Sequence, residues 1–413
     1  MKQRLFFFAF FLLFLSVPAF SLTEAEFIEQ FMAKNPRWAS IRLNPEITKQ
    51  AEGEYKGQFD TVLSLEGNYL VDKGAQSSTV FGTDNRQLTF DLGVAKKFPI
   101  GLTSSLHWVT TRNTTNSPFA TLSPYYEPSW ELGLRQSLLK NSLGFLDRQG
   151  ARGLSLETEQ ALLRARHQAE RELVAGIQSY WNLKSQQSLT QINEQFLKTA
   201  EDFLKAVRTR RSRGTAEKTD LYAAQALVFE RKNSLIQANS NLKGAQEEVS
   251  RLIGLGFEET VTADEKPEFE YTRTLEIEVR EALEKRPDYL ALKKELENQN
   301  IQITMAKNQR LPVVDLLATL TANGLKGDYG SALSDSATVD HPSLFTGVEM
   351  SLPLENRQAR AGLTRENIRK QQLVLELQDL ETNLVKEVRE ASRDLLVRLE
   401  MLKNLEEISR LQS

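Results

Sequence analysis

The chain has 413 residues, of which 40% are hydrophobic and 26% are charged, with a formal net charge of −3 and no cysteine. The near balance of charge argues against a nucleic-acid partner, because proteins that bind nucleic acid carry an excess of basic residues. The lack of cysteine excludes disulfides, thiolate metal sites and a lipid-modified N-terminal cysteine.

Residues 1–21 have the features of a secretory signal peptide. Lys2 and Arg4 precede a short apolar stretch, and Ala19-Phe20-Ser21 has the small-x-small form of a cleavage site. We expect cleavage after Ser21. No later segment contains a run of ~18 apolar residues. If the mature chain enters a membrane, it must therefore do so as a closed β-barrel.

Residues 23–57 read as a helix interrupted near Pro36 and Pro45, and the hydrophobic period then changes to two. Alternating apolar and polar residues predict strands at 62–71, 87–98, 102–110 and 130–138. Long loops at 72–86 and 112–126 alternate with a tight turn at 98–101, as in outer-membrane barrels.

Charged side chains lie on the face of these strands opposite the apolar one. The charged positions, including two in the later strands, are Glu66, Asp91, Glu131, Arg135, Asp315 and Glu349. A soluble β-sandwich would produce the same alternation, but a water-filled lumen accommodates these charges better.

From residue 151 the period becomes helical. Residues 151–208 predict one helix roughly 85 Å long, with a heptad stripe at Leu189, Phe196 and Phe203. A polar turn around Gly214 follows, and Thr215 or Thr219 is placed to cap the return helix. That helix has the clearest heptad in the chain, with the positions Leu221, Val228, Leu235, Leu242 and Val249. An isolated two-helix coiled coil explains this seam equally well.

The chain then repeats itself. An acidic segment at 255–285 ends in a short helix, and Arg286-Pro287-Asp288-Tyr289 matches Asn35-Pro36-Arg37-Trp38. The spacing from Pro36 to Leu65 equals that from Pro287 to Leu316. The domain organisation is therefore a first repeat at 22–254 (strands within 62–138, helical hairpin 151–254), a linker or equatorial segment at 255–285, and a second repeat at 286–413. The second repeat predicts a helix at 286–310, a strand from 311, a loop at 323–342, a strand at 344–354 and a final helix at 359–412.

Several motifs resemble the TolC-like outer membrane factor family. They are Ala282-Leu283 with Arg286-Pro287-Asp288, Lys307-Asn308-Gln309-Arg310 before a strand, Gly214 with Thr219-Asp220-Leu221 at a helix turn, and Ser351-Leu352-Pro353-Leu354 closing a strand. The resemblance implies a mixed α+β membrane protein that assembles as a homotrimer. Its strands would form a β-barrel in outer membrane lipid, and its helices a coiled-coil tunnel through the periplasm.

The function implied by the resemblance is a passive exit duct of a tripartite efflux pump or a type I secretion system. The partners would be a periplasmic adaptor protein and an inner-membrane transporter, with no nucleic acid and no cofactor. Adaptor docking would fall at the first hairpin tip, for which the candidates are Arg210, Arg211, Arg213, Gly214, Thr215, Thr219 and Asp220. The basic residues there also suit a solvated helix C-terminus without any partner. Candidates for the barrel lumen are Glu131, Arg135 and Glu349.

The chain departs from the family pattern in two ways. The family usually has two strands per repeat, whereas the first repeat here predicts four, so the extra pair either enlarges the barrel or folds outside it. The offset between repeats also places the counterpart of Gly214 beyond Ser413, so we expect a second repeat that is incomplete before its hairpin tip and return helix. The family's gate residues would lie in that region.

No catalytic or metal-binding constellation is evident, and we expect no enzyme activity. The three histidines have no ligand spacing, and no Gly-rich phosphate loop follows a strand. Two alternative functions remain: a periplasmic adaptor (membrane fusion) protein, which also carries a long helical hairpin, and a structural coiled-coil protein of the envelope.

Overall fold

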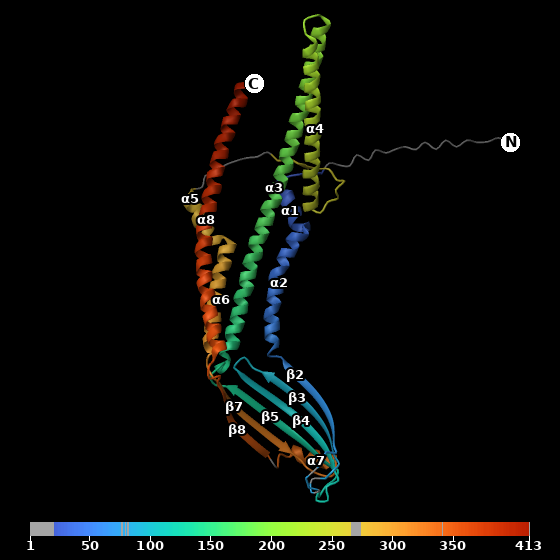
Figure 1. The fold of residues 1–413 in the computed structure, drawn as a ribbon, viewed down its shortest axis with the longest axis vertical. Helices are drawn as coiled ribbons and strands as arrows, with labels where there is room; N and C mark the ends of the chain where they lie inside the picture. Colours follow the sequence, from blue (N-terminus) through green and yellow to red (C-terminus); the bar gives the residue numbers. More distant parts are fainter. Residues whose placement is uncertain are drawn as a thin grey trace, which may run out of the picture. The chain divides into compact units, whose positions relative to one another are not determined.

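The computed structural model describes residues 20–75, 77, 78, 80, 82–265, 274–340 and 342–412. The expected signal peptide lies almost entirely outside these residues. The chain divides into two compact units, one of residues 1–44, 164–274 and 393–413, the other of residues 45–163 and 275–392. Figure 1 shows long helices and one sheet. Among the described residues, no helix combines the length and the apolar character needed to span a bilayer.

The second unit is built on one six-stranded antiparallel sheet. Its strands, in the order in which they lie side by side, are β2 (Thr61–Asp72), β3 (Asn85–Lys97), β4 (Leu102–Thr115), β5 (Tyr125–Ser137), β7 (Val313–Asn323) and β8 (Pro342–Ser351). All six strands were predicted from the period of two. The two repeats meet where β5 pairs with β7, so strands from both form one sheet.

Helices continue from the ends of these strands. They are α2 (Pro36–Gly57), α3 (Phe145–Ser212), α6 (Pro287–Asn308) and α8 (Arg357–Gln412), and the short helix α5 (Leu275–Lys285) directly precedes α6. Polar contacts link them within the second unit. Asn298 donates to Glu157 at 3.0 Å, and Glu295 accepts from Arg369 at 2.9 Å.

Two local predictions differ from the structure. The helix breaks at Asn35, before Pro36, but it continues through Pro45, which the sequence predicts as an interruption. Proline removes one intrahelical hydrogen bond, and the flanking turns hold the helix there. The predicted loop at 323–342 contains α7 (Tyr329–Ala337), which Asp328 caps by accepting from the backbone of Ser331 at 2.9 Å. Nine residues are too few to show a helical period.

The first unit has a core where α1 (Glu24–Lys34), α3 and α4 (Lys218–Leu252) meet. Phe27, Phe31 and Tyr180 are fully buried in it, and Tyr180 donates to the backbone carbonyl of Leu22 at 2.9 Å. The short strand β6 (Val261–Ala263) pairs in parallel with β1 (Phe20–Leu22) and is buried against this core. Part of the segment predicted as a linker is therefore a packed element.

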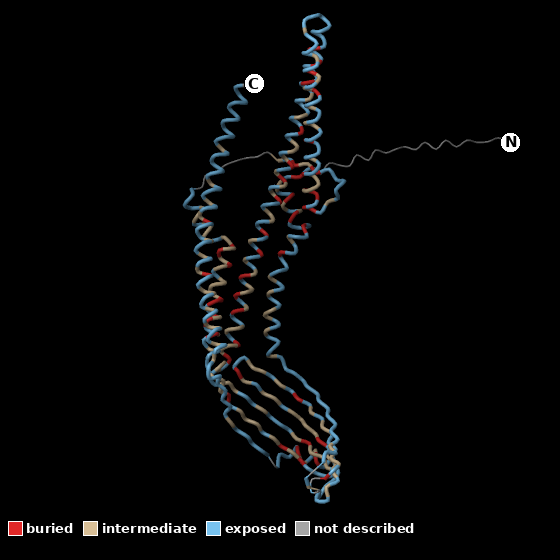
Figure 2. Tube along the Cα trace, viewed as in Figure 1, coloured by how far each residue is buried: buried red, intermediate tan, exposed pale blue. Residues whose placement is uncertain are grey.

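The long hairpin of α3 and α4 packs through one seam. The predicted heptad of α4 is buried at Val228 and Val249, with small residues Ala224, Ala238 and Ala245 between them. Small side chains allow two helices to approach closely. The heptad stripe predicted on α3 borders the seam with α4 but is not its buried part: Leu189, Phe196 and Phe203 are 45 to 51% exposed, and Arg231 of α4 lies over the ring of Phe196. Ala200, Leu204 and Val207 pack there instead. Figure 2 shows buried segments, in red, along the hairpin of α3 and α4.

Candidate channel wall and hairpin tip

One face of the six-stranded sheet is apolar from edge to edge. Residues paired directly across neighbouring antiparallel strands share a face of the sheet. One such row consists of Leu63, Val94, Leu106, Leu132, Leu320 and Leu344. The exposed fraction of the side chains in this row lies between 38% at Val94 and 71% at Leu63. Along this row the sheet presents an exposed apolar surface; nearer the loops, α7 (Tyr329–Ala337) packs against β5 and β7, and Ala322 is only 6% exposed there.

The opposite face is polar, as the alternation predicts. Ser64, Gly93, His107, Glu131, Thr321 and Ser343 form one row of it. In the next row, Glu66 pairs with Asp91. A sheet with one apolar and one hydrated face is what a wall between lipid and water requires.

The lumen candidates do not form one group. Arg135 on β5 donates to Asp315 on β7 at 2.7 Å and to Glu349 on β8 at 2.8 Å, so Arg135 and Glu349 come together. Asp315 is 4% exposed, and this pairing balances its buried charge. Glu131 lies on the same face opposite His107, outside that ion-pair network.

A second polar pair joins β3 to β4. His107 Nδ1 lies 3.0 Å from a carboxylate oxygen of Asp91. Gly93 is opposite His107, and a Cβ there would come within 2.7 Å of the imidazole ring, so only glycine leaves room for it. The sequence placed Asp91 and His107 on strands but did not pair them. Only the strand register reveals the contact.

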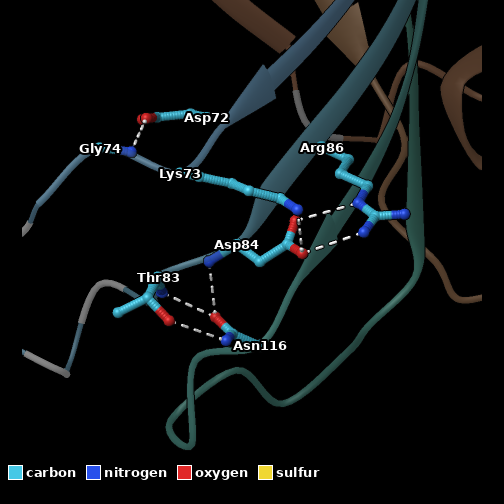
Figure 3. A network of polar contacts seen from close by, with 7 residues as sticks. All are labelled: Asp72, Lys73, Gly74, Thr83, Asp84, Arg86 and Asn116. Carbon is cyan, nitrogen blue, oxygen red and sulfur yellow. Dashed lines mark hydrogen bonds and ion pairs between the residues drawn. The ribbon is translucent and has the colours of Figure 1, made fainter.

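The loops at the far end of β2, β3 and β4 are tied together by a polar network, drawn in Figure 3. Asn116 accepts from the backbone N–H groups of Thr83 and Asp84 at 2.7 and 3.0 Å. Asp84 forms a two-point ion pair with Arg86, and this guanidinium holds the pKa of Asp84 below its usual value. The network fixes the open end of the β3–β4 hairpin.

The hairpin tip is a compact turn. α3 ends at Ser212, and Gly214 takes a φ of +76°, a left-handed conformation that glycine adopts without strain. The backbone N–H of Thr215 then donates to the backbone carbonyl of Arg210 at 3.0 Å. The expected cap of the return helix is wrong: Glu217 is the N-cap of α4, and its backbone N–H donates to Asp220 at 3.0 Å. A carboxylate at Asp220 also suits the helix N-terminus.

The tip residues share one turn, and the basic ones are exposed. Arg210, Arg211 and Arg213 are all exposed, and Thr219 contacts Glu217 at 3.3 Å. A Cβ at Gly214 would meet open space. The turn is therefore an accessible surface with a cluster of positive charge at the end of α3.

Within the described part of the chain, no three His, Asp or Glu side chains are grouped so that they could hold a metal ion. His107 is occupied by Asp91, and His341 lies outside the described residues. The two candidate functional surfaces are therefore the six-stranded sheet and the turn around Gly214.

Comparison with known proteins gives one family. Residues 144–255, which cover α3, α4 and the turn between them, match the model of the family described as outer membrane efflux protein. No curated protein matches the sequence.

Solved structures of outer membrane proteins share the fold along nearly the whole chain. CusC is 14% identical, with a TM-score of 0.67 over 94% of this chain and 78% of its own. OprN, an outer-membrane channel, is 18% identical, with a TM-score of 0.68 over 92% of this chain and 76% of its own. VceC from Vibrio cholerae is 13% identical, with a TM-score of 0.64 over 92% of this chain and 81% of its own. The chain thus matches the outer membrane efflux protein family in its helical hairpin and shares the fold of these outer membrane proteins along nearly its whole length.

Proposed function

We propose that this chain is one protomer of a trimeric exit duct in the outer membrane, which serves a tripartite efflux pump or a type I secretion system. Its sheets would combine into one β-barrel, and its helices into a periplasmic tunnel. The duct is a passive conduit, and energy comes from an inner-membrane transporter through a periplasmic adaptor.

One observation carries this proposal: the sheet has an apolar face that is exposed on all six strands, and two free edges. Among the described strands, β2 and β8 each pair on one side only. In a soluble protein, free strand edges and a large exposed apolar surface lead to aggregation. In lipid the apolar face is covered, and pairing of β2 with β8 of the next copy would close the wall.

The helical hairpin supports the same assembly. Besides the seam between α3 and α4, two heptad-spaced stripes stay exposed. They are Leu189, Phe196 and Phe203 on α3, and Tyr222, Phe229 and Ile236 on α4. Such stripes suit helices of neighbouring hairpins packed side by side. Further copies of this chain supply those helices in a trimer.

The sites follow from this arrangement. The polar face of the sheet would line the pore, so that Glu131, Arg135 and Glu349 contact the passing solute. The turn around Gly214 would meet the adaptor through Arg210, Arg211 and Arg213. Related channels with this fold include one described in an open state, MtrE from Neisseria gonorrhoeae.

Fractionation of cells that express the full chain tests the proposal. We expect the protein in the outer membrane fraction as a trimer that resists detergent at room temperature and dissociates on heating. A chain that lacks residues 1–21 is the control and should stay out of that fraction. Recovery of the full chain as a periplasmic monomer would contradict the proposal.

A further inference from the structure

The β3–β4 hairpin is an integral part of the sheet. β3 pairs with β2 from Thr61 opposite Lys96 to Asp72 opposite Asn85, and β4 pairs with β5 over a similar length. Four strands per chain would suffice for a wall of the kind that the family resemblance implies. These two strands lie between β2 and β5, which would otherwise be neighbours.

We propose that this hairpin stays in the wall of the assembled channel, so that six strands from each of three copies close a pore of eighteen. The inference rests on the proposed function and adds the width of the pore. Barrels of 16 to 18 strands leave an aqueous channel, and their diameter grows roughly in proportion to the strand number. The pore would be about 1.5 times as wide as one built from four strands per copy.

Both faces of the hairpin continue the faces of its neighbours. Val94 and Leu106 stand in the apolar row between Leu63 of β2 and Leu132 of β5. A hairpin folded away from the wall would remove Val94 and Leu106 from this row and leave the outer edges of β3 and β4 unpaired. The side chains instead fit a strand pair with lipid on one side.

The polar face of the hairpin is equally continuous. Asp91 pairs with Glu66 of β2, and His107 pairs with Glu131 of β5. The contact between Asp91 and His107 then joins the two strands within the hairpin. The polar face of the hairpin is thus in register with the polar faces of both neighbouring strands.

Because the β3–β4 hairpin adds two strands, its removal would leave β2 and β5 antiparallel to each other. β2 and β5 run in opposite directions, so they could pair directly if β3 and β4 were absent. Leu63 and Leu132 already belong to one row, and the faces would remain matched. The ends of the insertion also meet: the backbone N–H of Asn116 donates to the carbonyl of Asp84 at 3.3 Å.

This geometry defines a deletion variant. Removal of residues 85–115 joins Asp84 to Asn116 and should leave a four-stranded sheet. We expect both proteins to form outer membrane trimers, and electron microscopy of purified trimers should show the deletion variant with a barrel diameter about two thirds that of the full chain. Equal diameters would overturn the inference and leave the proposed function intact. Failure of the full chain to form trimers would overturn the proposed function instead.

Cysteine labelling of the full chain tests the inference even if the deletion variant does not fold. The chain has no cysteine, so single variants have no background. In the trimer, a charged water-soluble thiol reagent should label Ser105→Cys on the polar face but not Leu106→Cys on the apolar face. Leu132→Cys in β5 is the matched control for a position in the wall.

The comparison of these variants decides the matter. Leu106→Cys should be as protected as Leu132→Cys in the trimer, and both should label fully after denaturation. Labelling of Leu106→Cys as fast as Ser105→Cys, with Leu132→Cys still protected, would place the hairpin outside the wall and overturn the inference.

Discussion

Asp147 is the residue that joins the sheet to the helices of the second unit. Its carboxylate lies 2.7 Å from Lys97 Nζ at the end of β3 and accepts from Asn141 at 2.8 Å. It is 6% exposed and sits in the first turn of α3, where the helix dipole favours a negative charge. The buried carboxylate of Asp147 thus forms an ion pair with Lys97, accepts a hydrogen bond from Asn141 and places a negative charge at the N-terminus of α3.

Replacement of Asp147 by alanine should destabilise the protein by about 2 kcal/mol, because Lys97 and Asn141 lose a charged partner in a buried setting. The midpoint of urea unfolding, followed by tryptophan fluorescence, measures the loss. Glu159→Ala is the matched control: its ion pair with Lys294 is exposed, so the midpoint should hardly change. Equal shifts in the two variants would show that burial does not matter here.

Tyr180 predicts a distinct response to alkaline pH. Burial, together with the carboxylates of Glu265 and Glu24, raises the pKa of Tyr180 to about 12. The folded pKa is above the ordinary value of about 10, so Tyr180 stabilises the fold below pH about 10 and this contribution is lost as the pH rises toward 12. Absorbance at 295 nm should show one late tyrosine step. Tyr180→Phe should remove that step, and its persistence in the variant would contradict the assignment.

The hairpin of α3 and α4 has two kinds of apolar position: those buried in the seam between the helices and those exposed on the outside. Two adjacent residues of α4 allow their roles to be tested separately. Val228 is 7% exposed in the seam with α3, whereas Phe229 is 66% exposed. Val228→Ser should destabilise the hairpin by about 2 kcal/mol, since it buries a hydroxyl and leaves a gap. Phe229→Ser should leave the hairpin intact and weaken only the assembly of copies.

Limited proteolysis and trimer yield distinguish these effects. Val228→Ser should speed cleavage within α4, while Phe229→Ser should resist protease as the unmodified chain does but give fewer trimers. A Phe229→Ser protein with normal trimer yield would mean that the exposed stripe contacts no second copy.

The turn between α3 and α4 makes a separate prediction. Replacement of Arg210 and Arg211 by glutamate reverses the charge of an exposed surface. If the proposed adaptor docks there, its capture should fall at least tenfold with trimer yield unchanged. The control is Lys198→Glu, an exposed charge on α3 away from the turn. Loss of adaptor capture in the control as well would point to a general effect of charge.

The elements themselves were largely predictable, and the contacts between them were not. Alternation located all six strands, because one face of each is mainly apolar. The pairing of His107 with Asp91, and of Arg135 with Asp315, depends on register, which a period of two leaves open. The heptad on α3 was a true helical stripe, but its period could not say whether the partner was α4 or another chain.

At the scale of the whole molecule, the most consequential feature is apolar surface that a single copy leaves uncovered. The row from Leu63 to Leu344 crosses all six strands, and both ends of the row lie on free edges. A soluble sandwich would bury such a row under a second sheet. In this chain the described strands form a single sheet besides the short β1–β6 pair, and α7 packs only against β5 and β7, so no described sheet covers the row.

A charge placed on each face of β7 tests what covers the sheet. Leu320 lies on the apolar face and the adjacent Thr321 on the polar face, both in the interior of the sheet. Arginine on a lipid-facing strand costs about 2–4 kcal/mol near the middle of a bilayer, whereas a lumen position is tolerated. Leu320→Arg should therefore reduce the yield of outer membrane trimers at least tenfold, and Thr321→Arg should leave it close to normal.

The two variants distinguish lipid from water, because an arginine would be tolerated equally on both faces if water covered both. Leu320 is 39% exposed in a single copy, so a new charge there meets no packed core. If the apolar face were in contact with water, both arginines would be accepted. If it were covered by another protein, Leu320→Arg would yield a soluble monomer. Only lipid against this face predicts that Leu320→Arg is lost from the membrane while Thr321→Arg enters it and alters the conductance of the pore.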